Sequence, residues 1–278
     1  MHKNCKMLLN LVALAAAVAA VAGHGRVLGP PSRASMWRSG FPMEPNYDDD
    51  GLNCGGFARQ YLTNGGKCGL CGDPYDVEEP RPHELGGLYG QGIIVAKYEA
   101  GQVINATVQI SAYHRGYWVF KICPDPHITD QSCFDQHPVE LEEGGTRFYP
   151  PKEGIYSLNY RLPKGLICEH CVLQWRYIAG NNWGICEDET QGLGCGNQET
   201  FGACSDISIR IPVDSFPIEA VPLNGIDQGL LDFLRNMILR PPPKKYYSKH
   251  SLKKKKNHRQ PRSRKHSKKK KVSFWQYD

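Results

Sequence analysis

The sequence predicts an all-β fold, an immunoglobulin/fibronectin-like β-sandwich with long disulfide-pinned loops and short helices. Between residues 92 and 211, short segments rich in β-branched and aromatic residues follow one another closely, most of them with Gly or Pro nearby. No strong helical pattern interrupts them, and this spacing is typical of a sandwich. The cysteines are a second observation: ten follow residue 23, and an even number in an oxidising compartment indicates up to five disulfides.

The first 23 residues have the composition of a signal peptide. Two lysines precede an apolar run over residues 7–22, which is too short and too rich in Ala for a convincing membrane span. Cleavage after Gly23 would make His24 the first residue of the mature chain. We therefore expect residues 1–23 to be removed and the protein to be secreted, extracellular and soluble.

The predicted domain, residues 24–213, has two parts that differ in amino-acid composition. Residues 24–90 are rich in Gly, Pro, Asn and Asp, which predicts a long irregular region with short helical turns. The strands expected after it are 93–98, 102–111, 116–122, 154–161, 171–178 and 206–211. Asn105 begins an Asn-Ala-Thr sequon inside one of these segments, so a glycan there requires the side chain to face solvent.

The pairing of the cysteines stays open, because ten of them permit many combinations. Two Cys-X-X-Cys pairs superficially resemble a four-cysteine zinc site: Cys68-X-X-Cys71 and Cys168-X-X-Cys171. Zinc ribbons keep such pairs much closer in sequence, and secretion favours disulfides. We therefore expect disulfides.

Beyond the domain the chain becomes basic. Segment 214–240 is expected to be an extension with one short helix, and residues 241–278 a disordered basic tail. Fifteen Lys or Arg lie between Lys244 and Lys271, whereas residues 24–240 carry 17 basic and 27 acidic residues. The acidic body argues against a nucleic-acid or anionic-lipid surface there, while the tail leaves both open and could contact anionic glycans.

A histidine at a free N-terminus offers one metal ion two nitrogens, its α-amine and its ring Nδ1. One further imidazole would complete a near-planar set of three nitrogens, which suits copper. His114 is the candidate, because it follows an expected strand and precedes a turn marked by Gly116. Four loop histidines would serve equally well on chemistry alone: His83, His127, His137 and His170.

Three motifs make the interpretation of a copper site at His24 and His114 more specific. They are His24-Gly25 after the signal peptide, Ala112-Tyr-His114 after a strand, and Phe201-Gly-Ala-Cys-Ser-Asp-Ile207 near the end of the domain. This arrangement resembles the copper-dependent lytic polysaccharide monooxygenases, and most closely auxiliary activity family 15 of insects and other invertebrates. Cys54-Gly-Gly56, Cys68-Gly-Leu-Cys-Gly72 and Gly180-Asn-Asn-Trp-Gly184 are also similar to that family. The resemblance spans residues 24–213 and leaves the tail uncovered.

The resemblance implies roles for individual residues. His24, through its amine and ring, and His114, through its ring, would form a histidine brace around one copper ion. Phe201 would lie at the axial side of the copper, where a tyrosine is expected in this family, and Ala112 would crowd the other axial face. Gln174, on a predicted strand, would either hydrogen-bond the oxygen species at the copper or serve as a structural strand glutamine.

The resemblance also implies a reaction. An external electron donor would reduce the copper, which would use O2 or H2O2 to oxidise C1 or C4 of a sugar in an insoluble polysaccharide, chitin first and cellulose second. The protein is expected to act as a monomer through a flat surface with exposed aromatic side chains. Tyr47, Tyr61 and Trp37 are the candidates for that surface.

Two other functions remain open at this point. The chain could be a non-catalytic, disulfide-rich chitin-binding or matrix protein, which would release no oxidised oligosaccharides when given a reductant. It could instead be anchored to sulfated glycans or anionic surfaces by its tail, and such binding would fall steeply with added salt. No Ser-His-Asp hydrolase motif, phosphate-binding Gly loop or His-Glu-X-X-His is present in the sequence.

Overall fold

The computed structural model describes residues 24–128 and 130–212, so the expected signal peptide, C-terminal extension and basic tail lie outside the described residues. The strands are β1 (His24–Gly29), β2 (Ala96–Glu99), β3 (Val103–Ala112), β4 (Tyr117–Cys123), β5 (Pro138–Leu141), β6 (Gly154–Arg161), β7 (Cys168–Ile178), β8 (Trp183–Ile185), β9 (Gln191–Leu193) and β10 (Thr200–Arg210). Three single turns of helix accompany them: η1 (Met36–Ser39), η2 (Arg59–Thr63) and α2 (Ser132–Asp135). None of the helices in this part of the chain is long and apolar enough to cross a membrane.

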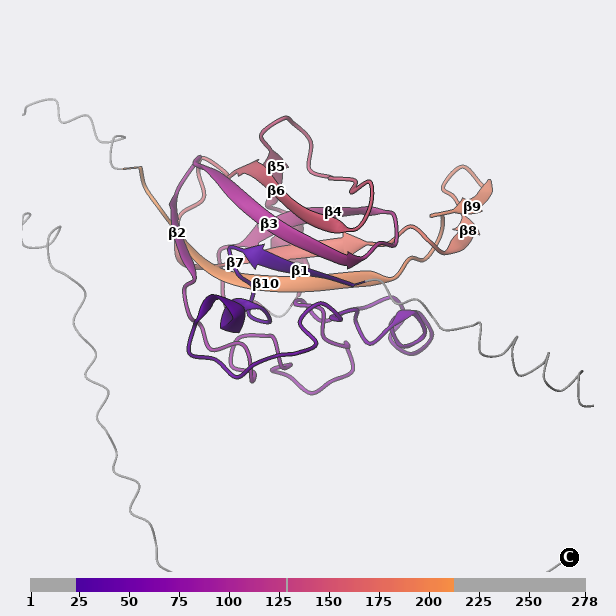
Figure 1. Ribbon diagram of the computed structural model, residues 1–278, viewed down its shortest axis with the longest axis horizontal. Helices are drawn as coiled ribbons and strands as arrows, with labels where there is room; N and C mark the ends of the chain where they lie inside the picture. The colour runs from indigo at the N-terminus through magenta and orange to yellow at the C-terminus, as the bar shows by residue number, and fades with distance from the viewer. Residues whose placement is uncertain (1–23, 129, 213–278) are drawn as a thin grey trace, which may run out of the picture. The chain divides into compact units, whose positions relative to one another are not determined.

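Eight strands form the β-sandwich that the sequence predicts. They are hydrogen-bonded in the order β1-β3-β6-β5-β4-β7-β10-β2, and β8 pairs with β9 as a separate hairpin. The short β5 pairs with β6 on one side and with β4 on the other, so the series folds over into two layers. Figure 1 shows β3 and β6 in one layer above β7 and β10 in the other.

The core lies between these layers and follows from the alternation of side chains along each strand. On β7, Trp175 and Tyr177 point inward, and on β10, Phe201 and Ala203 do the same. One hydrogen bond between side chains lies within this core: the Trp118 indole N–H donates to the Tyr160 hydroxyl at 3.0 Å. Burial raises the pKa of Tyr160 to about 12, so this side chain stays a neutral hydrogen-bond partner at physiological pH.

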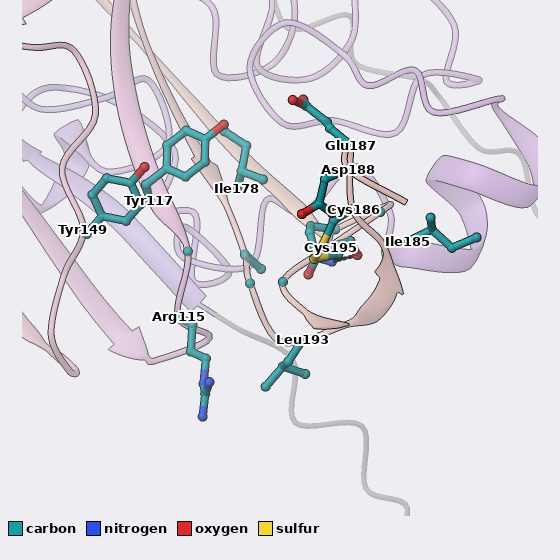
Figure 2. A pocket seen from close by; sticks show the side chains of 16 residues that line it. Arg115, Tyr117, Tyr149, Ile178, Ile185, Cys186, Glu187, Asp188, Leu193 and Cys195 are labelled. Carbon is teal, nitrogen blue, oxygen red and sulfur yellow. Dashed lines mark hydrogen bonds between the residues drawn. A yellow bond between two sulfur atoms is a disulfide. The ribbon is translucent and has the colours of Figure 1, made fainter. Parts of the chain in front are cut away.

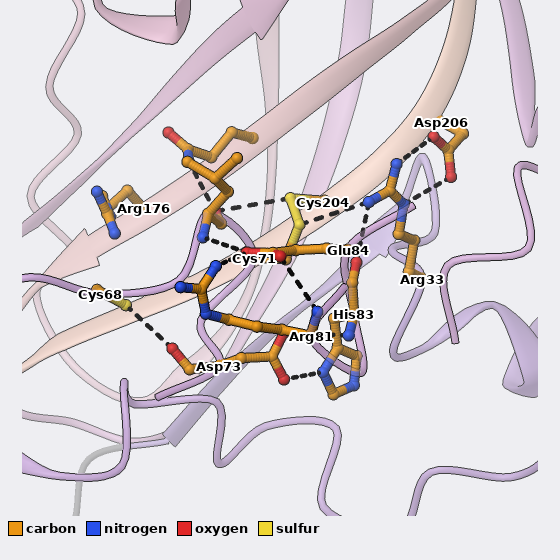
Figure 3. Close-up of a disulfide and its surroundings, with 12 residues drawn as sticks. Arg33, Cys68, Cys71, Asp73, Arg81, His83, Glu84, Arg176, Cys204 and Asp206 are labelled. Atoms are coloured by element: carbon orange, nitrogen blue, oxygen red, sulfur yellow. Dashed lines mark hydrogen bonds and ion pairs between the residues drawn. A yellow bond between two sulfur atoms is a disulfide. The ribbon is translucent and has the colours of Figure 1, made fainter. Parts of the chain in front are cut away.

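The other face of β7 and β10 carries a layer of loops. Figure 1 shows the indigo and purple loops of residues 30–90 lying along β10, on the side away from β3. The Cys71–Cys204 disulfide ties this segment to β10, and Arg33 donates from Nε and Nη2 to Asp206 at 2.7 and 2.6 Å. Figure 3 shows the Arg33–Asp206 pair beside the disulfide. His170 Nε2 lies 2.7 Å from the same carboxylate.

All ten cysteines of the domain are paired. The disulfides are Cys54–Cys68, Cys71–Cys204, Cys123–Cys133, Cys168–Cys171 and Cys186–Cys195. The prediction of five disulfides is therefore confirmed, and the four cysteines that resemble a zinc site are in three different bridges.

The structure differs from the predicted strands mainly at the N-terminus. Residues 24–29, expected to be loop, form β1, because pairing with β3 supplies hydrogen bonds that compensate for the weak strand propensity of two glycines. β10 begins at Thr200 rather than at residue 206, and the short strands β5, β8 and β9 have no counterpart in the prediction. The expected helical turns in the early loops are η1 and η2.

The Arg33–Asp206 pair is expected to contribute to the stability of the fold. Asp206→Ala leaves a buried guanidinium without its counter-ion, so we expect a loss of about 3–5 kcal/mol in the free energy of unfolding. Chemical denaturation with the disulfides intact measures it. Asp76→Ala is the matched control, since its partner Arg59 is exposed and should tolerate the change. Equal effects of the two substitutions would show that the buried pair does not hold the loop layer.

Candidate metal centre

The register of β1 on β3 positions His24. His24 lies opposite Ala112, and a bulge follows it before Gly25 pairs with Ile110. Gly25 is required here because the backbone lies against an indole: a Cβ on it would come within 2.9 Å of the Trp175 ring. The Gly25 N–H donates to the Asp50 carbonyl at 2.9 Å, which fixes the start of the strand from the loop side.

His114 follows the end of β3 and is held by the turn after it. Arg115 and Gly116 both have positive φ, 55° and 72°, so the chain reverses sharply toward β4. The His114 N–H donates to the Tyr177 hydroxyl at 3.2 Å, and its carbonyl accepts from Gly180 at 2.8 Å. The backbone of His114 is therefore bonded to β7 and to the segment that follows it.

The ring of His114 is buried and oriented through Nδ1. The Asn181 carboxamide nitrogen lies 3.1 Å from this atom, and Oε2 of Glu199 lies 3.8 Å from it. Burial is the larger cause that lowers the pKa of His114, and the charge of nearby His24 lowers it further. His24 and His114 thus lie at the same end of the sandwich, since His24 is opposite Ala112, and His114 favours the neutral form that binds metals.

The donor set at this pair fits a metal that prefers nitrogen. Among residues 24–128 and 130–212, no cluster of three or more His, Cys, Asp or Glu side chains is arranged to hold a metal ion. A metal bound by His24 and His114 would therefore need another kind of donor. An α-amine freed at His24 would be that donor, and a set of three nitrogens suits copper.

Phe201 lies in the aromatic layer beneath His114. Its side chain is fully buried on β10, opposite Tyr177 in the register, and the two ring centroids are 5.7 Å apart. Because the Tyr177 hydroxyl accepts from the backbone of His114, Phe201 is linked to the histidine through one intervening ring.

Glu199 is a site residue that the sequence analysis missed. Its Oε1 accepts from Asn53 at 2.9 Å, and its Oε2 is the carboxylate oxygen near the His114 ring. The position of Glu199 in the sequence could have indicated its place near the site. It comes two residues before Phe201, so on an extended strand the two side chains share a face.

Gln174 is not brought to the histidines. It lies on the face of β7 opposite Trp175 and Tyr177, fully buried under the loop layer. Its Nε2 donates to the Leu70 carbonyl at 2.7 Å and to Gln131 at 2.9 Å. These contacts favour the structural role that the sequence analysis left open for this glutamine.

The three predicted surface aromatics differ in exposure. Tyr47 is 81% exposed, and its ring lies edge-on to half-buried Trp37 at 5.3 Å. Tyr61 is half-buried, and its hydroxyl donates to the Gln198 carbonyl. The structure adds Trp183, which is 67% exposed on β8, two residues after Asn181.

A hollow of about 900 Å³ opens beside Arg115, the residue after His114, between the sandwich and the β8–β9 hairpin. Figure 2 shows Tyr117 and Tyr149 together on one wall and Ile185 and Leu193 on the hairpin opposite. The Cys186–Cys195 disulfide closes the hairpin, so this wall is cross-linked.

Asn105 is exposed on β3, as a glycan would require. Its Nδ2 donates to Asn159 on the neighbouring strand at 3.2 Å.

Known proteins resemble this chain over the same region. Residues 24–207 match the protein family described as "lytic polysaccharide mono-oxygenase, cellulose-degrading". A solved structure of a lytic polysaccharide monooxygenase of family AA15 from Thermobia domestica, in the Cu(I) state, is 49% identical. The match covers 68% of this chain and 100% of that one, with a TM-score of 0.66. No curated protein matches. The chain therefore belongs to the lytic polysaccharide monooxygenases, within auxiliary activity family 15.

Proposed function

We propose that this chain is a secreted copper monooxygenase that cleaves crystalline chitin oxidatively, with cellulose as the second substrate. The observation that carries the proposal is the convergence of His24 and His114 at one end of the sandwich. The family match and the Cu(I) state of the Thermobia relative support copper as the ion. Residues 24–213 would be the catalytic domain, monomeric, with residues 1–23 removed on secretion and Asn105 glycosylated.

Copper held by His24 and His114 would supply the oxidising chemistry after reduction by an external donor and reaction with O2 or H2O2. This chemistry would hydroxylate C1 or C4 of a sugar and so break the glycosidic bond. The chain's own residues orient and shield that site. Asn181 fixes the His114 ring through Nδ1, which leaves Nε2 as the ring nitrogen for the metal. Glu199 places a carboxylate beside the same ring, where it can accept or return a proton.

Phe201 would fill the axial side without offering an oxygen ligand. Its full burial against Tyr177 keeps water out of this part of the core, so solvent and the solid substrate would reach a copper held by the two histidines from the exposed side. Exposed side chains around that side, Trp183 on the hairpin and Tyr113 next to His114, would contact the polysaccharide.

The function is tested with the processed protein on chitin and cellulose, with ascorbate as donor and mass spectrometry of the products. Oxidised oligosaccharides that require both copper and ascorbate are the expected result. Binding to chitin with no oxidised product would replace this proposal with the non-catalytic chitin-binding or matrix protein.

Removal of the second histidine should abolish tight copper binding. His114→Ala deletes one of three proposed nitrogen donors, and we expect the copper Kd to rise by at least about 100-fold while thermal unfolding changes little. His127→Ala, at an exposed loop position, is the control. If calorimetry finds unchanged copper affinity in His114→Ala, the second ligand is a different residue.

An added phenol should change the electronic environment of the copper. Phe201→Tyr would place an oxygen at the proposed axial side, so we expect retained activity and a shifted Cu(II) electron paramagnetic resonance spectrum. A spectrum identical to that of the parent protein would place residue 201 away from the metal.

Trp183 should contribute to adsorption rather than to folding. We expect Trp183→Ala to weaken binding to chitin by about fivefold or more, because it removes a large exposed ring beside the site. Leu62→Ala, at a residue of η2 that is 81% exposed, controls for general loss of apolar surface. Equal adsorption of the two variants in a pull-down assay would exclude the hairpin from the substrate surface.

A further inference from the structure

A second cavity, of about 610 Å³, lies on the loop face of β7 and β10. Arg176, Ile178 and Thr200 form its floor, and side chains of the early loops, including Tyr61 and Tyr75, form its walls. Because side chains alternate along a strand, this cavity is on the opposite face of the sheet from Tyr177 and Phe201. Its volume is that of a small-molecule binding site.

Arg176 brings an uncompensated positive charge to the floor of this cavity. Its Nη1 donates to Gln131 at 2.9 Å, whereas its buried Nε has no hydrogen-bond partner. No carboxylate of the described residues is within ion-pairing distance of it. Asp135, the acid that acts on it at longer range, is engaged by Lys121 at 2.6 Å. The Arg176 side chain is half-buried, and a cation whose Nε is buried without a partner or counter-ion is costly, so the site favours an anion.

Lys67 is the second cation in the lining that adds to this preference. Lys67 lies with its ammonium 5.1 Å from the centre of the Tyr75 ring and forms no ion pair within the described part of the chain. Arg81 is already neutralised by Glu79 and Glu84, at 3.0 and 2.8 Å. In Figure 3 the guanidinium groups of Arg81 and Arg176 lie on the same side of the Cys71–Cys204 disulfide.

The cavity also offers hydrogen-bond acceptors, which a simple anion would not use. Gln60 donates from Nε2 to the Gly66 carbonyl and to Thr200, but its Oε1 is buried without a partner. The carboxylate of Asp130 is a second acceptor in the lining. A buried acceptor is satisfied by a hydroxyl donor, so the complementary ligand carries both a carboxylate and hydroxyl groups.

We propose that this cavity binds a small polyhydroxy carboxylate of the uronic- or aldonic-acid type. The carboxylate pairs with Arg176 and Lys67, the hydroxyls donate to Gln60 and Asp130, and the ring or chain packs against Tyr61 and Tyr75. This inference is independent of the proposed copper chemistry, since no residue of the histidine pair takes part.

The test is isothermal titration of the full, metal-free protein with sodium D-glucuronate, D-glucose and sodium acetate. Saturable binding of glucuronate, with neither glucose nor acetate binding over the same range, is expected. Lack of glucuronate binding, or equal binding of acetate, would overturn the proposal.

Two variants locate the binding. Arg176→Lys loses the planar fork, and Lys67→Gln removes an exposed charge that folding does not need. We expect each to weaken glucuronate binding by about tenfold. Arg161→Lys, on β6 away from the cavity, should bind as the parent does. If Arg176→Lys fails to fold, Lys67→Gln alone tests whether glucuronate binds in this cavity. Unchanged glucuronate affinity in that variant would place the ligand elsewhere.

Discussion

The antiparallel pairing of β1 with β3 is the constraint on which the proposed metal centre depends. It sets His24 opposite Ala112, so that the histidine that ends the Ala112-Tyr-His114 motif reaches the same end of the sandwich. Gly25 allows this pairing to sit directly on the Trp175 indole, where any side chain would collide. A slip by one residue would turn every side chain of β1 to the other face and separate the two imidazoles.

The loop layer supports the same end of the molecule from the other side. Asp50 accepts from Gly25, and Asn53 bonds to Glu199, so residues of one loop hold both the start of β1 and the start of β10. The Cys71–Cys204 disulfide and the buried Arg33–Asp206 pair fasten this layer to the sheet. The rigidity of the site therefore comes from covalent and ionic links as well as from the sandwich core.

Much of the fold could be predicted from the sequence, because strands such as 102–111 and 154–161 carry regular β-branched and aromatic patterns. β1 could not, since its strand conformation comes from tertiary pairing and not from its glycine-rich residues. His24 and His114 were proposed as ligands from their motifs, whereas no motif marks Glu199, which the structure places beside the His114 ring. The orientation of Gln174 could not be predicted from its position in the sequence. It lies on a predicted strand, but the alternation of side chains along the strand directs it toward Leu70 and Gln131.

The α-amine of His24 is the donor proposed to complete the copper site, and two forms of the protein that differ by one residue test this role. The chain beginning at His24 and the chain retaining Gly23 share every side chain of the site, but only the first offers an amine on His24. The account predicts tight binding of one copper, with three nitrogen ligands in the electron paramagnetic resonance spectrum, by the form that begins at His24, and a large loss of affinity in the longer form. Equal affinity and identical spectra would contradict it.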